Sequence, residues 1–207
     1  MTSFEKIYKD FLFQIEDDGI GYLSKEEFYE ALEGYLLKSA VLDFKNCRTE
    51  LDYQPNREIV EVFYGNGLTD TFFLSNKLKN DIYHSLLVID GVVLDDCMYS
   101  LDGSELHLNF NPNPHSTINL TVKEIGYFTE ELTKEEESIL AEIMVLHWIR
   151  KQIVREDNLK ASISTSDYKR SSSANMLDKL IALQEKQEEV IRKHIISYSQ
   201  FGFEGFN

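Results

Sequence analysis

The sequence predicts an α+β protein: a helical bundle of two helical hairpins, with a small antiparallel β-sandwich or barrel domain inserted between them. Apolar residues recur with helical spacing near both ends of the chain, whereas in the middle they alternate in short runs separated by glycine turns. Helices, strands and helices in that order indicate a β module inserted into a helical body. We expect an N-terminal helical hairpin (1–56), the inserted β domain (57–128), a long C-terminal helical hairpin that completes the helical body (129–198) and an aromatic C-terminal tail (199–207).

The N-terminal region has the pattern of two helices. Ser3 is positioned to cap the first helix, whose apolar residues are Phe4, Ile7, Tyr8, Phe11, Leu12 and Ile15. This helix should end before Asp17-Asp18-Gly19. Ser24 and Glu27 have the spacing of a capping box, in which the two side chains satisfy backbone N–H groups at the start of a helix. They should therefore begin the second helix, with apolar positions at Phe28, Ala31, Leu32, Tyr35 and Leu36.

The middle of the chain has the alternating pattern of short antiparallel strands. The first run is Glu58–Tyr64, and Gly65-Asn66-Gly67 should turn it back as a hairpin into Thr69–Leu74. Asp90-Gly91 and Asp102-Gly103 predict two further hairpins, because such pairs supply the positive backbone angles of a tight turn. Short strands at this spacing favour a sandwich or barrel. The last core strand is expected at Ile118–Val122.

The C-terminal region predicts two long helices joined by a short polar break, which gives an antiparallel hairpin. Thr133 and Glu136 form a capping box at its start. The first helix has an unusually broad apolar face, so it should contact neighbours on more than one side. The break lies at 162–167, and the apolar residues beyond it are Tyr168, Met176, Leu177, Leu180, Ile181, Leu183, Val190, Ile191, Ile195 and Ile196.

The chain is strongly acidic. Its 36 Asp and Glu residues against 21 Lys and Arg residues give a formal net charge of -15. Tight binding of nucleic acid requires basic residues that displace counterions, so the negative charge argues against tight binding. The same charge is compatible with a channel wall past which DNA slides without adhering. No apolar run could span a bilayer and no signal peptide is evident, so no membrane association is expected. Cys47 and Cys97 match no ligand spacing and are expected to be free thiols in a reducing compartment.

No motif in the sequence predicts an enzyme. There is no glycine-rich phosphate loop, no Gly-x-Ser-x-Gly elbow and no His-Glu-x-x-His helix, and nothing sets a nucleophile against a base. The 5 histidines form no short metal pair, and His147 is expected to be packed or capping rather than ligating. We therefore expect no catalytic residue, no cofactor and no metal site.

Residues 16–27 offer one alternative. A helix, an acidic glycine-bearing loop and a second helix resemble the EF-hand calcium loop, with its glycine, ninth and twelfth positions at Gly21, Ser24 and Glu27. The first position is Glu16, longer than the usual short carboxylate, and the fifth is Ile20, which has no side-chain oxygen. A capped helical hairpin also accounts for every residue of this stretch, so calcium binding stays open as a second hypothesis.

The C-terminal tail carries three phenylalanines separated by glycines. This composition disfavours a helix, and exposed aromatic side chains are unfavourable in isolation. The tail should therefore either fold back onto its own helices or dock in a neighbouring subunit, as an added strand or with its rings in pockets. The interface candidates are the tail anchors Phe201, Phe203 and Phe206, and the residues that would pack the hairpin or a subunit interface, Met144, Trp148 and Ile149.

The C-terminal third resembles a family of tailed-bacteriophage virion proteins from the head-to-tail neck. The residues that carry the resemblance are Leu132-Thr133-x-x-Glu136-x-x-Ile139-Leu140-Ala141, Met144-x-x-x-Trp148-Ile149, Leu159, Ser166-Asp167-Tyr168-Lys169 and Ser173-Ala174-Asn175-x-Leu177-x-x-Leu180. Ala40–Phe44 also resembles the start of that family's linker segment. The β insert, with Val88-Ile89-Asp90-Gly91-Val92, Pro114 and Ile118, is similar to small sandwich modules of phage structural proteins.

The resemblance implies a non-enzymatic connector or adaptor that joins the portal to the tail. Such a protein would be made in the host cytoplasm and assemble in the virion neck as a homo-oligomeric ring, for which twelvefold order is one arrangement the family allows. Portal and tail or neck proteins would be its partners, and DNA would pass through the channel without specific binding. Besides the calcium-responsive binding protein, a cytosolic interaction adaptor is the other alternative.

Overall fold

The structure is a computed structural model that describes residues 1–15, 23–75, 77–78, 81–162 and 170–201, without the side chains of 159–162, 170–175 and 201. The chain forms two compact units, which are described separately. The helical unit comprises Met1–Tyr22, Ala31–Asp52 and Phe128–Asn207, and the β unit comprises Leu23–Glu30 and Tyr53–Tyr127.

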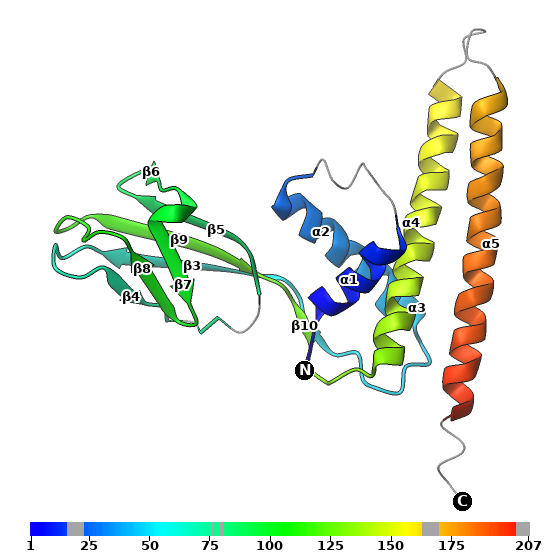
Figure 1. Ribbon diagram of the computed structural model, residues 1–207, viewed down its shortest axis with the longest axis horizontal. Helices are drawn as coiled ribbons and strands as arrows, with labels where there is room; N and C mark the ends of the chain where they lie inside the picture. Colours follow the sequence, from blue (N-terminus) through cyan, green and yellow to red (C-terminus); the bar gives the residue numbers. More distant parts are fainter. Residues whose placement is uncertain (16–22, 76, 79–80, 163–169, 202–207) are drawn as a thin grey trace, which may run out of the picture. The chain divides into compact units, whose positions relative to one another are not determined.

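The helical unit is built around α4 (Lys134–Ser162) and α5 (Arg170–Phe201), which run antiparallel side by side (Figure 1). α1 (Phe4–Gln14) also packs against α4, as does the π-helical segment η2 (Leu36–Ala40), which follows α2 (Lys25–Tyr35) and continues into the short α3 (Val41–Asp43). The broad apolar face of α4 therefore does meet neighbours on more than one side, as predicted. Its fully or nearly fully buried residues are Ile139, Leu140, Ala141, Ile143, Met144 and Ile149.

The three predicted helix caps are present. The Ser3 hydroxyl accepts a hydrogen bond from the Glu5 backbone N–H at the start of α1. At α2, the Ser24 hydroxyl accepts from the Glu27 N–H, and the Glu27 carboxylate accepts from the Ser24 backbone at 3.0 Å. Both residues of each box lie within one helical turn, so the local sequence is sufficient to specify the cap.

The β unit contains two open antiparallel sheets. The larger has the order β3-β9-β5-β6, and the smaller has the order β4-β8-β7. A third, very small sheet has the order β1-β10-β2. The bounds are β1 Thr2–Ser3, β2 Tyr53–Gln54, β3 Arg57–Tyr64, β4 Thr71–Phe73, β5 Ile82–Ile89, β6 Val92–Val93, β7 Tyr99–Asp102, β8 Glu105–Leu108, β9 Thr117–Glu124 and β10 Tyr127–Phe128, with a 3-10 turn at Asp96–Met98.

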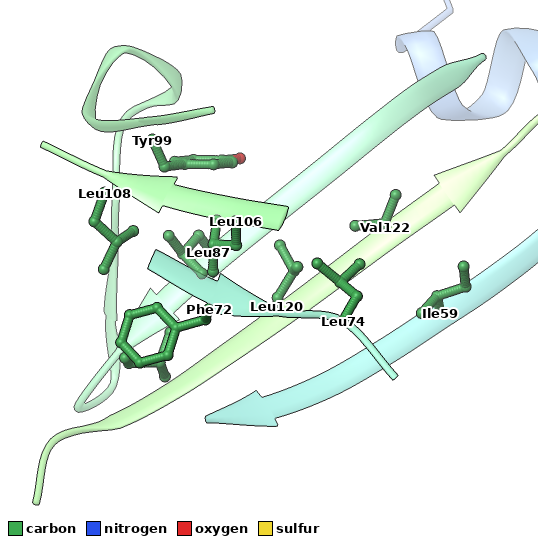
Figure 2. Packing of buried hydrophobic residues seen from close by; sticks show 10 residues of the cluster. Ile59, Phe72, Leu74, Leu87, Tyr99, Leu106, Leu108, Leu120 and Val122 are labelled. Carbon is green, nitrogen blue, oxygen red and sulfur yellow. The ribbon is translucent and has the colours of Figure 1, made fainter. Parts of the chain in front are cut away.

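One apolar core holds the two larger sheets of the β unit together (Figure 2). Leu120 and Val122 of β9 alternate with polar residues, so that only one face of the strand contributes to the core. The Phe63 ring of β3 lies 5.4 Å from the Phe72 ring of β4, which joins one sheet to the other. The buried members of the core are Ile59, Phe72, Leu74, Leu87, Tyr99, Leu106, Leu108, Ile118, Leu120 and Val122.

Two of the three predicted hairpins are correct. Asp90 and Gly91 have positive φ angles of 50° and 83° and join β5 to β6, and Asp102-Gly103 joins β7 to β8. The hairpin predicted at Gly65-Asn66-Gly67 is wrong, because β3 pairs with β9 whereas β4 pairs with β8 in the other sheet. A glycine turn reverses the chain, but it does not determine which strand becomes the hydrogen-bonded neighbour.

The predicted fold class is wrong in its architecture, although the protein is α+β. There is no bundle of two helical hairpins: α1 and η2 each pack on α4, and the first turns of α2 belong to the β unit. There is also no closed barrel, because the strands form separate small antiparallel sheets. Helical periodicity shows that one face is buried but not against which element, and this is the reason for the error.

Leu120 tests the core of the β unit. Its side chain is fully buried in the central strand β9, so Leu120→Ala should leave a cavity and lower the free energy of unfolding by about 2–5 kcal/mol. Urea denaturation followed by the circular dichroism of the strands measures this change. Thr121→Ala, at the next and only half-buried position, is the matched control and should cost less than about 1 kcal/mol. Equal effects of the two variants would contradict the assignment of the core face.

Candidate functional site

The base of the α4–α5 hairpin is organised by a buried carboxylate. Glu136, in the first turn of α4, is only 1% exposed. It accepts hydrogen bonds from the backbone N–H and the hydroxyl of Thr133 at 2.8 and 3.0 Å, which completes the predicted capping box. It also accepts from the backbone N–H and the hydroxyl of Thr49 at 3.1 and 2.9 Å, and from the Tyr198 hydroxyl of α5. One carboxylate thus joins three separate parts of the helical unit.

The hydrogen bonds determine the charge state of Glu136. Burial alone raises the pKa of a carboxyl group, but the bonds from Tyr198, Thr133 and Thr49 favour the ionised form more strongly and lower the pKa of Glu136 to about 2. The same cluster has the opposite effect on Cys47, whose Sγ lies 3.5 Å from the carboxylate. Burial, together with the nearby negative charge, raises the pKa of the Cys47 thiol to about 12, so this thiol is poorly reactive.

Tyr198 fixes the C-terminal part of α5 to the segment after α3. Its hydroxyl accepts a hydrogen bond from the Arg48 backbone N–H at 2.8 Å, and the Arg48 guanidinium donates to the Tyr198 carbonyl. The guanidinium carbon also lies 4.4 Å from the centre of the Tyr198 ring, and the Phe44 ring is 5.7 Å from it. Burial and the bond to Glu136 raise the pKa of Tyr198, so its hydroxyl stays a donor.

Polar contacts continue along the two helices. Glu142 of α4 lies 3.1 Å from the Nδ1 atom of His194, and its backbone carbonyl accepts from the Gln187 side chain. Farther from the base, Arg150 pairs with Glu188 at 3.1 Å. These contacts use one side of α5, the side that also carries the buried Leu180, Ile191 and Tyr198. They hold the register of the hairpin and define which side of α5 is turned away from α4.

Three apolar residues of α5 stay partly exposed along the edge of its contact with α4. Met176, Leu183 and Val190 follow one another at intervals of seven, which places them close to one line along the helix. Their exposed fractions are 50%, 43% and 40%. We call these three residues the α5 row. Such a row at heptad spacing is the kind of surface to which another helix or subunit binds.

A second row, of lysines, lies beside the α5 row. Lys179, Lys186 and Lys193 each follow one of its members by three residues, so they occupy the adjacent strip of the helix surface. All three are exposed. We call them the lysine row. Because the chain as a whole is strongly acidic, a basic strip next to an apolar one is a distinctive feature of this helix.

The interface candidates named from the sequence lie in different places. Met144 and Ile149 are fully buried within the helical unit, and Trp148 is half-buried. Met144 and Ile149 are therefore not available to another molecule in this arrangement. Phe203 and Phe206 lie outside the described residues, and the Phe201 side chain is not described although its backbone ends α5. The role of the three phenylalanines stays a prediction.

The α5 row was missed as a site at the level of sequence. Its members were included in the apolar pattern of the second long helix, but the pattern was interpreted as a single face turned to the partner helix. The seven-residue spacing of Met176, Leu183 and Val190, each followed by a lysine three residues later, was the available signal. Only the structure shows that these three residues stay between 40% and 50% exposed at the edge of the hairpin contact.

Most of the EF-hand-like stretch, residues 16–22, lies outside the described residues. Glu27, which would be the twelfth ligand, uses its carboxylate to cap α2, and the bonds from the Ser24 backbone and hydroxyl lower its pKa. Among the residues that the structure describes, no group of three or more His, Cys, Asp or Glu side chains is placed to hold a metal ion.

Comparisons with known proteins identify no family for this chain. No protein-family model matches it, and a search of curated proteins finds no match. Within the described part of the chain, none of the helices combines the length and apolar composition that a membrane span requires.

The lowered pKa of Glu136 predicts that the fold loses stability in acid. A carboxyl group whose pKa is lowered from 4.5 to about 2 stabilises the protein above pH 4.5, and the contribution is lost as the pH falls from 4.5 towards 2. The shift corresponds to roughly 3 kcal/mol. Glu136→Gln should therefore destabilise the protein at pH 7 and flatten the decline of stability between pH 4.5 and 2, as measured by urea unfolding at each pH.

The control for this measurement is Glu130→Gln, which changes an exposed carboxylate close to the start of α4. It should leave the stability at pH 7 within about 0.5 kcal/mol and preserve the decline in acid. If Glu136→Gln behaved like this control, the buried carboxylate would not be the group that joins the helical unit.

Proposed function

We propose that this protein is a non-enzymatic structural subunit of a bacteriophage virion, a connector or adaptor of the head–tail neck that assembles with copies of itself into a ring between portal and tail. The observation that supports self-assembly best is the α5 row, an apolar strip that stays partly exposed along the edge of the α4–α5 contact. The assignment to the neck rests on the resemblance of the C-terminal third to neck proteins.

Further apolar residues of the hairpin support a surface that other subunits cover. Val154 of α4 is 58% exposed, and Ile181 and Ile196 of α5 are 41% and 51% exposed. The contact between α4 and α5 does not bury these residues, whereas a neighbouring subunit can. A net charge of -15 is compatible with a channel that DNA crosses without adhering, since like charges repel the phosphates.

Leu183 tests whether the α5 row mediates assembly. If the row lies in a subunit contact, Leu183→Glu buries a charge there and should raise the dissociation constant of the oligomer at least tenfold, or about 1.4 kcal/mol for each contact. Native mass spectrometry and sedimentation velocity of the purified chain at increasing concentration measure the oligomer and its order.

The matched control is Leu42→Glu, the same substitution at a residue of α3 that is 63% exposed and lies outside the row. It should leave assembly unchanged, and both variants should keep the circular dichroism of the parent. A parent chain that remains monomeric up to about millimolar concentration, where even very weak complexes form, and that is absent from purified particles would refute the proposal.

The aromatic tail gives an independent test of assembly. Deletion of residues 199–207 removes Phe201, Phe203 and Phe206 but retains Tyr198 and its bond to Glu136, so the helical unit should stay folded. If the tail docks in a neighbour, the oligomer should weaken while the urea midpoint of the monomer does not change. Unchanged assembly together with a lower urea midpoint would show instead that the tail packs on its own subunit.

A further inference from the structure

The strand β3 forms one edge of the larger sheet of the β unit. The sheet has the order β3-β9-β5-β6, so β3 pairs with β9, and no strand among the described residues pairs with its other side. At 8 residues β3 is longer than the other edge strands of the two larger sheets, β6, β4 and β7, which have 2, 3 and 4 residues. A long unpaired edge presents a row of backbone N–H and C=O groups to which another extended chain can bind.

The hydrogen-bond pattern shows which backbone groups of β3 face this open edge. The Gly65 N–H, directly after β3, donates to the Ser116 carbonyl, whereas the next carbonyl, that of Thr117, accepts from the turn between β5 and β6. Bonded and non-bonded positions alternate along an antiparallel pair. The odd-numbered residues of β3 therefore bond to β9, and the N–H and C=O groups of Val60 and Val62 point to the open edge, where they bond to no residue that the structure describes.

The side chains beside the open edge are apolar and exposed. Val60, Val62 and Tyr64 project from the face of the sheet opposite to the core, and their exposed fractions are 60%, 49% and 70%. Their neighbours on β9 include Thr121 and Asn119, which carry no charge. The edge therefore requires an extended segment as its partner, and the face beside it favours a segment with apolar side chains.

We propose that the C-terminal tail of this protein binds as an added strand to the open edge of β3 in a neighbouring copy. The tail follows α5 directly, and residues 202–207 lie outside the described part of the chain. Six extended residues reach about 20 Å, which is also the length of β3 from Glu58 to Tyr64. The chain thus supplies a terminal segment long enough to pair with the whole open edge.

The composition of the tail also fits an added strand. Gly202 and Gly205 disfavour continuation of the helix, and phenylalanine is common in strands. Phe203 lies between the two glycines, so its ring can pack on the exposed valines of β3 without a second bulky side chain at the adjacent position on either side of the glycines. Main-chain hydrogen bonds would supply affinity, and the ring of Phe203 would fix the register.

The consequence concerns the symmetry of the assembly. A contact between a tail and a strand edge joins two different surfaces of the same protein, so it repeats in one direction and closes into a ring when the rotation between neighbours permits. This inference rests on the proposed ring function and deepens it, because it names the strand that receives the tail.

Photo-cross-linking of the full-length chain tests the proposal. Phe203 is replaced by benzoylphenylalanine, and this chain is mixed with an equal amount of ¹⁵N-labelled parent chain, allowed to exchange subunits and irradiated. Mass spectrometry should find peptides that join position 203 of the unlabelled chain to β3 of the labelled chain. The same amino acid in place of Phe13, a residue of α1 that is 92% exposed, is the control and should give no link to β3.

Proline at the open edge provides the quantitative arm. Val62→Pro removes an N–H that takes no part in the pairing with β9, so the sheet should persist. The dissociation constant of the oligomer, measured by sedimentation velocity, should rise about tenfold or more because a hydrogen bond to the tail is lost. Val60→Lys combined with Val62→Lys repeats the test without a change in the backbone and should have the same effect.

Val93→Pro is the matched control for Val62→Pro. Val93 is 62% exposed in β6, at the opposite edge of the same sheet. Its N–H also points away from the sheet, because the neighbouring Leu94 N–H is the one that donates to Leu87 of β5. This variant should alter the dissociation constant less than about threefold and, like Val62→Pro, should keep the circular dichroism of the parent.

The outcomes separate this inference from the function it deepens. Oligomers that tolerate the proline and lysine variants of β3 and give no link from position 203 to β3 overturn the inference but leave the ring proposal intact. Links to β3 that never join the two labels show that the tail pairs within its own chain and also overturn the inference. A chain that stays monomeric overturns both.

Discussion

The helical unit depends on one ionised carboxylate held out of water. Glu136 closes the start of α4 through Thr133, receives two bonds from Thr49, and receives the hydroxyl of Tyr198 from α5. A buried charge is unfavourable unless hydrogen bonds surround it, and removal of any donor would leave an unsatisfied group in the interior. The same hydrogen bonds that compensate the charge are therefore the bonds that fix the base of the hairpin, so the stability of the helix start and the position of α5 are coupled.

That coupling has a consequence for the outer surface of α5. With Tyr198 fixed at one end and Arg150 paired to Glu188 farther along, the helix can neither rotate nor slide against α4 without breaking bonds. Met176, Leu183 and Val190 are thereby kept partly exposed at the edge of the hairpin contact. A docking surface on a helix gains affinity when the helix is already held in its bound orientation, because less freedom is lost on binding.

Local features of the fold were predictable from sequence, and long-range ones were not. Ser24 with Glu27 and Thr133 with Glu136 act within one turn, and Asp90-Gly91 encodes its own backbone angles, so each could be recognised from a few adjacent residues. The pairing of β3 with β9 rather than with β4 depends on residues about sixty positions apart, and so does the bond of Tyr198 to Glu136. No local pattern carries that information, which is why the overall architecture was predicted wrongly and the capping box was not recognised as the centre of a tertiary network.

The candidate site illustrates the same limit at the level of single side chains. Leu180 and Leu183 are both apolar members of one helical pattern, yet the first is buried and the second is 43% exposed. An apolar residue in an amphipathic helix can face its own core or a partner, and the sequence pattern is the same in both cases. What separates them here is the packing of α5 on α4, which buries the strip of Leu180 and Ile191 and leaves Leu183 at its edge.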